Sequence, residues 1–168
     1  MTDRTLVLIR HAKAVAAAAS DEVRPLADRG RRDALAAGRW LTELSVTPDL
    51  VVVSPATRAR ETWECIAEVV TSVDRRVDDR IYDNTVDDLL DVVADVPDEV
   101  ASLALVGHNP SMHGLAITLD DGDGDRAAQA AIRDGYPTCG IAVFDVRGTW
   151  SQLRAGAATL RAFEAPRG

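Results

Sequence analysis

The stretch TLVLIRHAKA, residues 5–14, places an unbroken apolar run directly before two polar side chains. A short continuous run such as Leu6–Ile9 is typical of a strand that is buried on both faces of a parallel sheet. Arg10 and His11 follow at once, at the carboxyl end of that strand. Because open α/β sheets bind their ligands beyond the carboxyl ends of their strands, the stretch predicts a central strand with a binding site at its end.

Two further apolar runs, residues 49–53 and 102–106, end in the same way. SPATR follows the first run and GHNP follows the second, which puts Arg58 and His108 just beyond the strand ends. If the three strands are neighbours in one sheet, four polar side chains converge on one place. These candidate site residues are Arg10, His11, Arg58 and His108.

The four side chains suit a phosphoryl group. Ser54-Pro55 and Asn109-Pro110 are typical of the N-cap and first position of a helix, and a helix N-terminus attracts anions through its free N–H groups. The planar guanidinium of arginine matches the spacing of phosphate oxygens. Two arginines, two histidines and two predicted helix starts therefore indicate a phosphoryl-binding site.

Between the apolar runs, apolar residues recur at helical spacing. The predicted stripes are Ala34, Ala37, Leu41 and Leu44; Trp63, Ile66, Ala67 and Val70; Val86, Leu89, Leu90 and Val93; and Met112, Leu115, Ala116 and Leu119. Buried strands that alternate with amphipathic helices predict an α/β fold, a three-layer α/β/α sandwich around a mostly parallel sheet. We expect a single domain over residues 1–168.

The remaining segments carry weaker signals. Residues 76–81 are predicted as a short strand, and residues 141–146 and 149–155 as a closing hairpin around Arg147-Gly148. Residues 14–29 and 120–138 are predicted as loops, and the second of them is the one sizeable element available to shape the entrance of the site.

The formal net charge of −8 argues against a general nucleic-acid or anionic-membrane binder, but it permits a local cationic pocket. Two cysteines, far apart in the sequence, define no disulfide framework. No signal-peptide pattern precedes the first apolar run, and no apolar run approaches the ~20 residues of a membrane span. We expect a cytoplasmic protein.

Four segments together resemble the histidine phosphatase superfamily: LIRHAKA, RPLADRGRRDA, VVVSPATRARETWE and LVGHNPSM. The short chain and the RPL…G element are similar to the SixA branch of that superfamily, which acts on protein phosphohistidine. The resemblance implies the phosphoglycerate-mutase-like fold and His11 as the nucleophile, which would carry a covalent phosphohistidine. No metal-ligand cluster is visible in the sequence, and this chemistry needs no metal or other cofactor. It also implies that Arg10, Arg58 and a protonated His108 hold the phosphoryl oxygens. Ala12 departs from the pattern, which usually has glycine there.

The leaving group needs a proton, and the sequence leaves its source open. Asp83, Asp87 and Asp88 fall in the region where larger members of the superfamily carry an acid. The simpler interpretation is that these three acids lie on the polar face or at the N-terminus of a short helix. The alternative is that one of them, Asp83, is the general acid. If no acid reaches the site, a phosphoramidate such as phosphohistidine is favoured, because imidazole leaves far more readily than an alkoxide.

The predicted partner is therefore a phosphorylated protein or a small phosphorylated substrate, with no nucleic acid and no membrane. A phosphatase for a metabolite phosphomonoester is the alternative of the same class, and a non-catalytic phosphoryl-binding module is the alternative of another class. The sequence leaves the oligomeric state open.

Other polar residues have simpler interpretations. Lys13 is expected to be solvated, and Arg24 either lines the mouth of the site or anchors its loop. His113, five residues after His108, fits no helical zinc motif and is expected on the surface. The acidic run that begins at Asp120 lacks the glycine and glutamate that an EF-hand loop requires, so it predicts a solvated turn.

Overall fold

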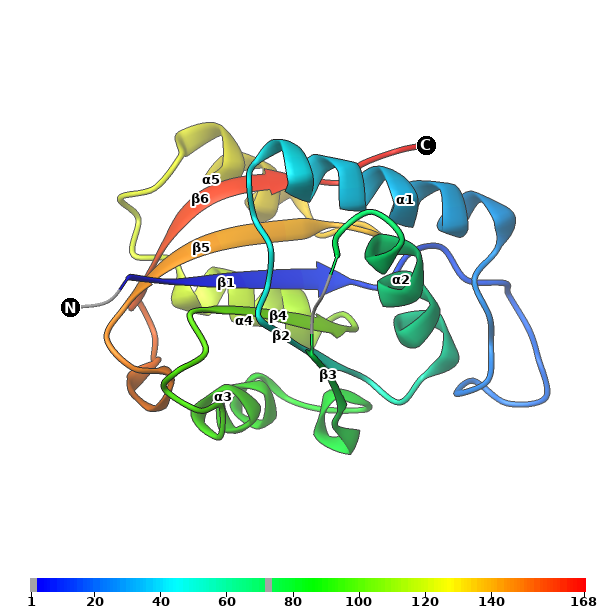
Figure 1. Ribbon diagram of the computed structural model, residues 1–168, viewed down its shortest axis with the longest axis horizontal. Helices are drawn as coiled ribbons and strands as arrows, with labels where there is room; N and C mark the ends of the chain where they lie inside the picture. The colour runs from blue at the N-terminus through cyan, green and yellow to red at the C-terminus, as the bar shows by residue number, and fades with distance from the viewer. Residues whose placement is uncertain (1–2, 72–73) are drawn as a thin grey trace.

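The computed structural model describes residues 3–71 and 74–168 (Figure 1). Its six-stranded sheet has the order β3-β2-β4-β1-β5-β6. The strands are β1 (Asp3–Arg10), β2 (Leu50–Val53), β3 (Asp74–Val77), β4 (Ser102–Gly107), β5 (Ile141–Arg147) and β6 (Ala158–Glu164). The α-helices are α1 (Asp28–Glu43), α2 (Thr57–Ala67), α3 (Val86–Ala94), α4 (Ser111–Leu119) and α5 (Arg126–Asp134), and the short 3-10 helices are η1 (Asp79–Ile81) and η2 (Trp150–Gln152).

The four strands β3, β2, β4 and β1 are parallel, whereas β5 and β6 are antiparallel to their neighbours in the sheet. The prediction that the three apolar runs are neighbours is confirmed, because β4 lies between β1 and β2. Their register aligns the strand ends: Arg10 pairs with Gly107, and Val53 pairs with Val106. The segments that follow the three strands therefore begin at the same edge of the sheet.

Helices cover both faces of this sheet, which confirms the three-layer α/β/α sandwich. Val7 and Ile9 of β1 belong to the core that includes α1 and α2. Leu6 and Leu8 belong to the opposite core, which includes α3, α4 and α5. All four side chains are fully buried, as expected for a central strand without a solvent face.

Residues 120–138 are not the loop that the sequence predicts, because α5 lies within them. Asp125 caps this helix by accepting a hydrogen bond from the Ala128 N–H at 2.8 Å. Ala128 and Ile132 are buried on its inner side, and Gly135 follows its last residue. The many alanines give the helix a weak apolar stripe between two polar segments, which explains why the pattern is missed.

Two strand predictions are also corrected. The partner of β5 is β6, not residues 149–155, within which Trp150–Gln152 form η2 and the Trp150 side chain is buried. Trp150 Nε1 donates to the Val100 carbonyl at 2.8 Å, which holds η2 against the end of the sheet that precedes β4. The strand expected at residues 76–81 is β3, which ends at Val77 and is followed by η1.

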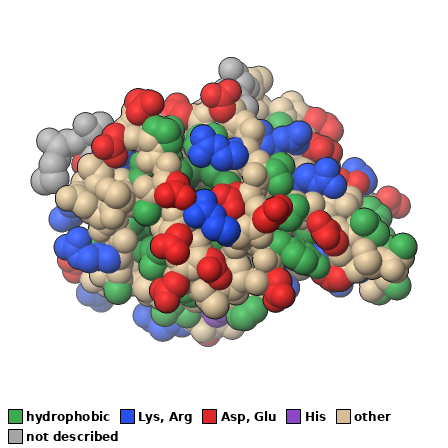
Figure 2. Space-filling model, turned by 90° about the horizontal axis from the view of Figure 1, so that it is seen from below, with side chains coloured by type: hydrophobic (Ala, Val, Ile, Leu, Met, Phe, Trp, Pro, Cys, Tyr) green, Lys and Arg blue, Asp and Glu red, His purple; other side chains and the backbone are tan. Residues whose placement is uncertain are grey.

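The charged side chains of both signs are mixed on the surface. On the face shown in Figure 2, acidic and basic side chains are interspersed. Within the described residues, no helix combines the length and apolar character that a bilayer crossing requires.

Both cysteines are buried, and burial raises the pKa of the Cys65 thiol and that of the Cys139 thiol, the latter to about 12.

Gly30 fixes the distance between α1 and the segment that follows β1. A Cβ atom at this position would lie 2.1 Å from the Lys13 carbonyl oxygen. That oxygen also accepts a hydrogen bond from the Ala27 N–H at 2.9 Å, so it is not free to move. The start of α1 thus rests directly on the backbone two residues beyond His11.

Gly30→Ala is expected to destabilise the protein by about 2 kcal/mol, because the added methyl group overpacks this contact. Helix propensity alone would change the free energy of unfolding in the opposite direction, by about 1 kcal/mol. Gly114→Ala is the matched control, since its Cβ would meet one side-chain methyl group, Val86 Cγ2, at 3.0 Å. Urea unfolding measures both changes. A Gly30→Ala protein that is as stable as Gly114→Ala would contradict the packing argument.

Candidate active site

His11 stands at the end of β1, and its backbone is held by neighbours on both sides. Its N–H donates to the Gly107 carbonyl at 3.0 Å, and its carbonyl accepts from the Cys139 N–H at 3.0 Å. The next residue, Ala12, donates its N–H to Thr62 Oγ1 of α2 at 2.9 Å. These contacts fix the direction in which the imidazole projects. Ala12 lies outside the positive-φ region, so a methyl group at the usual glycine position introduces no backbone strain.

The His11 ring has a defined tautomer. Its Nδ1 lies 2.8 Å from the Ala12 carbonyl oxygen, which can only accept, so Nδ1 carries the proton and Nε2 keeps a free lone pair. Burial, followed by the charges of Arg58 and Arg10, lowers the pKa of His11 to about 4, against the opposing effect of the Ala12 hydrogen bond. The ring is therefore neutral at pH 7. A neutral imidazole with an unprotonated Nε2 is a competent nucleophile.

Arg58 lies in the first turn of α2 and is almost fully buried. Its guanidinium donates to the Asp21 carbonyl oxygen at 2.8 Å and to Asp21 Oδ2 at 3.0 Å. Its Nη2 also lies 3.4 Å from His108 Nδ1. The side chain is thus oriented by two loops that are far apart in the sequence.

His108 follows β4 and has Ser54, which follows β2, as its partner. His108 Nε2 lies 2.7 Å from Ser54 Oγ. Because Arg58 can only donate, Nδ1 accepts from it and Nε2–H donates to Ser54. Burial, followed by the nearby His11 and Arg58, lowers the pKa of His108 to about 3. The free protein therefore differs from the expectation of a protonated His108, whose ring is neutral here.

All four predicted site residues meet at one cavity. Arg10, His11, Arg58 and His108 line a pocket of about 310 Å³, and the ring centroids of His11 and His108 are 5.2 Å apart. Arg10 donates from Nη1 to the Tyr136 carbonyl at 2.9 Å, which steadies its guanidinium at the rim. The pocket has cationic arginines and neutral imidazoles on its walls, so its chemistry favours an anion such as a phosphoryl group.

The predicted helix starts are wrong in detail. α2 begins at Thr57 and α4 at Ser111, each after a short turn. The Ser54 hydroxyl accepts from the Ala56 N–H at 3.2 Å inside the turn and faces His108. Arg58 therefore enters the pocket from the first turn of the helix rather than from a position further along it.

Asp21 and Tyr82 are site residues that sequence reasoning misses. Tyr82 donates its hydroxyl to Asp21 Oδ2 at 2.6 Å, and its ring meets that of His108 edge-on at 5.6 Å. Arg24 binds Asp21 Oδ1 as well, at 2.9 Å. The Tyr82 hydrogen bond, followed by those from Arg24 and Arg58, holds the pKa of Asp21 well below its usual range. No local pattern signals these contacts, which join segments 61 residues apart.

The remaining candidates fall near the site. Arg24 lines the pocket and also donates to the Val15 carbonyl at 2.8 Å, so both of its expected roles are present. Lys13 is exposed on the pocket wall. Asp83 lines an adjoining cavity of about 230 Å³ that shares Arg58 and His108 with the first one.

The structure also places three other polar residues that the sequence analysis considers. Asp88 completes a capping box with Thr85 at the start of α3, and Asp87 is exposed in the same turn. His113 is not the surface residue that the sequence predicts: it is half-buried, and its Nε2 donates to the Ile132 carbonyl at 2.7 Å. Within residues 3–71 and 74–168, no group of three or more His, Cys, Asp or Glu side chains is placed to hold a metal.

The sequence matches the family model described as "Histidine phosphatase superfamily (branch 1)" over residues 6–92, which include Arg10, His11 and Arg58. The chain belongs to this superfamily. An uncharacterised protein of Mycobacterium tuberculosis H37Rv is 39% identical over 95% of this chain and 100% of its own length. One from Mycobacterium leprae is 33% identical over 88% of this chain and 90% of its own.

Solved structures extend the likeness to the whole fold. A chain from Nakamurella multipartitia, provisionally assigned as the phosphohistidine phosphatase SixA, matches with a TM-score of 0.88 and 34% identity over 99% of this chain and 98% of its own. The protein histidine phosphatase SixA in complex with tungstate matches with a TM-score of 0.78 and 25% identity, over 96% and 97%. A phosphoglycerate mutase from Plasmodium falciparum, with a TM-score of 0.66 and 16% identity over 100% and 94%, shares the fold.

The two neutral histidines make stability depend on pH. Their pKa values are lowered in the folded protein from an ordinary value of 6.5, to about 4 for His11 and about 3 for His108. Below pH 6.5 the unfolded chain binds protons that the folded one excludes. The contribution of the two histidines to the free energy of unfolding is therefore fully present above pH 6.5, and it is lost as the pH falls toward 4.

We expect the free energy of unfolding to fall by roughly 3 kcal/mol from His11 alone between pH 7 and pH 4, with a further loss from His108. The measurement is urea unfolding at each pH. Ordinary carboxylate protonation is controlled for by the double variant His11→Gln/His108→Gln, which lacks both titrating rings. A wild type that loses no more stability than this variant would show that the histidines are not held neutral.

Proposed function

We propose that this protein is a protein phosphohistidine phosphatase that acts through a covalent phosphohistidine on His11. The observation that carries the proposal is the hydrogen bond from His11 Nδ1–H to the Ala12 carbonyl. It leaves the Nε2 lone pair free in a pocket that Arg10, Arg58 and His108 also line. Membership of the histidine phosphatase superfamily and the likeness to SixA structures support the same activity.

In the first step, His11 Nε2 attacks phosphorus in line, and the bond from phosphorus to the substrate nitrogen breaks. The substrate imidazole carries a proton on its other ring nitrogen, so it leaves as a neutral ring. Arg10 and Arg58 hold the phosphoryl oxygens, whose charge they neutralise. A bound phosphoryl dianion also raises the proton affinity of His108, which lines the pocket beside Arg58. His108 can thus become the cationic ligand that the sequence suggests once substrate is present.

In the second step, water attacks phosphorus, the bond from phosphorus to Nε2 breaks, and inorganic phosphate leaves with free His11 restored. The SixA relative was solved in complex with tungstate, a tetrahedral oxyanion like phosphate, which supports oxyanion binding by a protein of this fold. Asp21 assists indirectly, since it orients Arg58 before the substrate arrives.

Phosphohistidine suits the site as a substrate because its imidazole is a good leaving group. A metabolite phosphomonoester is the second candidate, and the position of Asp83 favours it. Asp83 lines the cavity next to Arg58 and His108, where a carboxylic acid could protonate a departing alkoxide. The two substrates therefore differ in whether they need Asp83.

His11→Ala is expected to lower turnover of a phosphohistidine protein at least about a thousandfold, because the attacking nitrogen is lost. Acid-labile ³²P label should appear on His11 of the wild type during turnover. His108→Ala keeps the nucleophile and should still become labelled, at a lower rate. Turnover by His11→Ala at a rate near that of the wild type would refute the covalent mechanism.

Asp83→Asn separates the two substrate classes. If Asp83 is a general acid, its loss should slow hydrolysis of an alkyl phosphate by about a hundredfold, the low end for acid catalysis, and leave phosphohistidine hydrolysis within about threefold of the wild type. Asp87→Asn removes a nearby exposed carboxylate and serves as the control. Equal rates for all three proteins on the alkyl phosphate would exclude Asp83 from proton transfer.

A further inference from the structure

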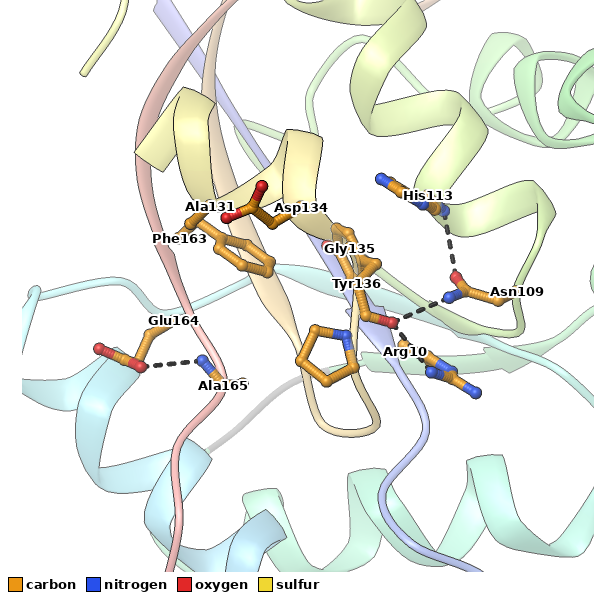
Figure 3. A pocket seen from close by; sticks show the side chains of 11 residues that line it. Arg10, Asn109, His113, Ala131, Asp134, Gly135, Tyr136, Phe163, Glu164 and Ala165 are labelled. Carbon is orange, nitrogen blue, oxygen red and sulfur yellow. Dashed lines mark hydrogen bonds between the residues drawn. The ribbon is translucent and has the colours of Figure 1, made fainter. Parts of the chain in front are cut away.

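A second and larger cavity adjoins the phosphoryl pocket. It has a volume of about 880 Å³, and Arg10 and Asn109 line both cavities (Figure 3). Both of these side chains donate to the Tyr136 carbonyl, at 2.9 and 2.8 Å, so the boundary between the two cavities is fixed. A group that is attached to a phosphoryl in the first cavity has direct access to the second, which we call the side groove.

The side groove has an apolar wall. Pro137, Phe163 and Ala165 line it, and the buried ring of Tyr136 backs Phe163 with a centroid separation of 5.0 Å. The Tyr136 hydroxyl donates to the Leu8 carbonyl at 2.6 Å, which anchors this wall to β1. An aromatic ring held in this way offers a fixed π-face to a ligand.

Two carboxylates, Asp134 and Glu164, also line the groove. In the view of Figure 3, the Phe163 ring lies between them. Both are exposed, and neither forms an ion pair with any residue that the structure describes. Asp134 is also the last residue of α5, where the helix dipole adds negative potential.

The charges of the groove are therefore divided along its length. Its one Lys or Arg side chain among the described residues is Arg10, at the end shared with the phosphoryl pocket. His113 also lines the groove, and its Nε2 donates to the Ile132 carbonyl at 2.7 Å. The two carboxylates and the aromatic ring both attract a cation. A ligand that complements both cavities has an anionic phosphoryl group and a cationic group a short distance away.

We propose that the side groove binds a lysine or arginine side chain of the phosphorylated polypeptide, close in sequence to its phosphohistidine. The inference rests on the proposed function and adds to it the class of substrate that the site prefers. The aliphatic stem of the side chain packs on Phe163 and Pro137, and its charged end meets Asp134 and Glu164. Specificity then comes from the groove, whereas the chemistry remains in the phosphoryl pocket.

The test is a binding measurement with peptides that carry a non-hydrolysable phosphohistidine analogue. One set has lysine at each position from three residues before to three residues after the analogue, and the matched set has norleucine there, which keeps the stem and removes the charge. The protein variants are Asp134→Asn/Glu164→Gln and the control Asp91→Asn/Glu99→Gln. The control removes the same charge from two exposed residues that do not line the groove and that form no ion pair with any described residue.

We expect the wild type and the control to bind the best lysine peptide about five- to tenfold more tightly than its norleucine match, with the preference reduced at high salt. Asp134→Asn/Glu164→Gln should bind the two peptides equally and keep the affinity of the wild type for the norleucine peptide. A wild type without preference at any position, or an equal loss of preference in the control, would overturn the inference.

The phosphatase activity and the binding preference of the groove are tested by separate measurements. Turnover of authentic phosphohistidine peptides by the wild type, compared with His11→Ala, tests the activity, and the binding preference tests the groove. Active wild-type protein without a charge preference would refute the groove alone. A charge preference without His11-dependent turnover would refute the phosphatase and leave a phosphoryl-binding site with a basic subsite.

Discussion

The parallel register of β1, β4 and β2 is the constraint on which the site depends. It places Arg10 opposite Gly107 and Val53 opposite Val106, so the segments that follow the three strands leave the sheet at one edge. The next backbone hydrogen bonds continue this register beyond the strands: the N–H of His11 reaches Gly107, and that of Ser54 reaches Val106. A shift of one residue in either pairing would turn His11 or Ser54 toward the opposite face of the sheet.

Electrostatics then decide the protonation states within this frame. Burial, followed by the nearby charged groups of the pocket, lowers the pKa of both histidines and keeps them neutral, although the chain as a whole carries a net charge of −8. Asp21 provides the local counter-charge, and it contacts Arg58 from outside the pocket. Asp21 thereby holds the Arg58 guanidinium in place and offsets only part of the positive potential of the pocket. The pocket stays cationic in an acidic protein.

Much of this arrangement could be predicted from the sequence, because continuous apolar strands and the polar residues after them leave a strong local pattern. Arg10, His11, Arg58 and His108 stand at such positions, and the structure brings all four together. The helix α5 and the strand β6 have weaker patterns, since one is rich in alanine and the other is a half-exposed edge strand. The contacts of Asp21, Tyr82 and Ser54 join distant segments, so no spacing within the sequence could reveal them.

The choice of nucleophile has a consequence for redox chemistry. Peroxide attacks thiolates, and the reactivity of a cysteine follows its thiolate fraction and its exposure. In this protein Cys65 and Cys139 are buried with raised pKa values, and the proposed attacking atom is the nitrogen of an imidazole. The phosphatase chemistry proposed for this fold therefore continues under oxidative conditions that would silence an enzyme whose nucleophile is a cysteine.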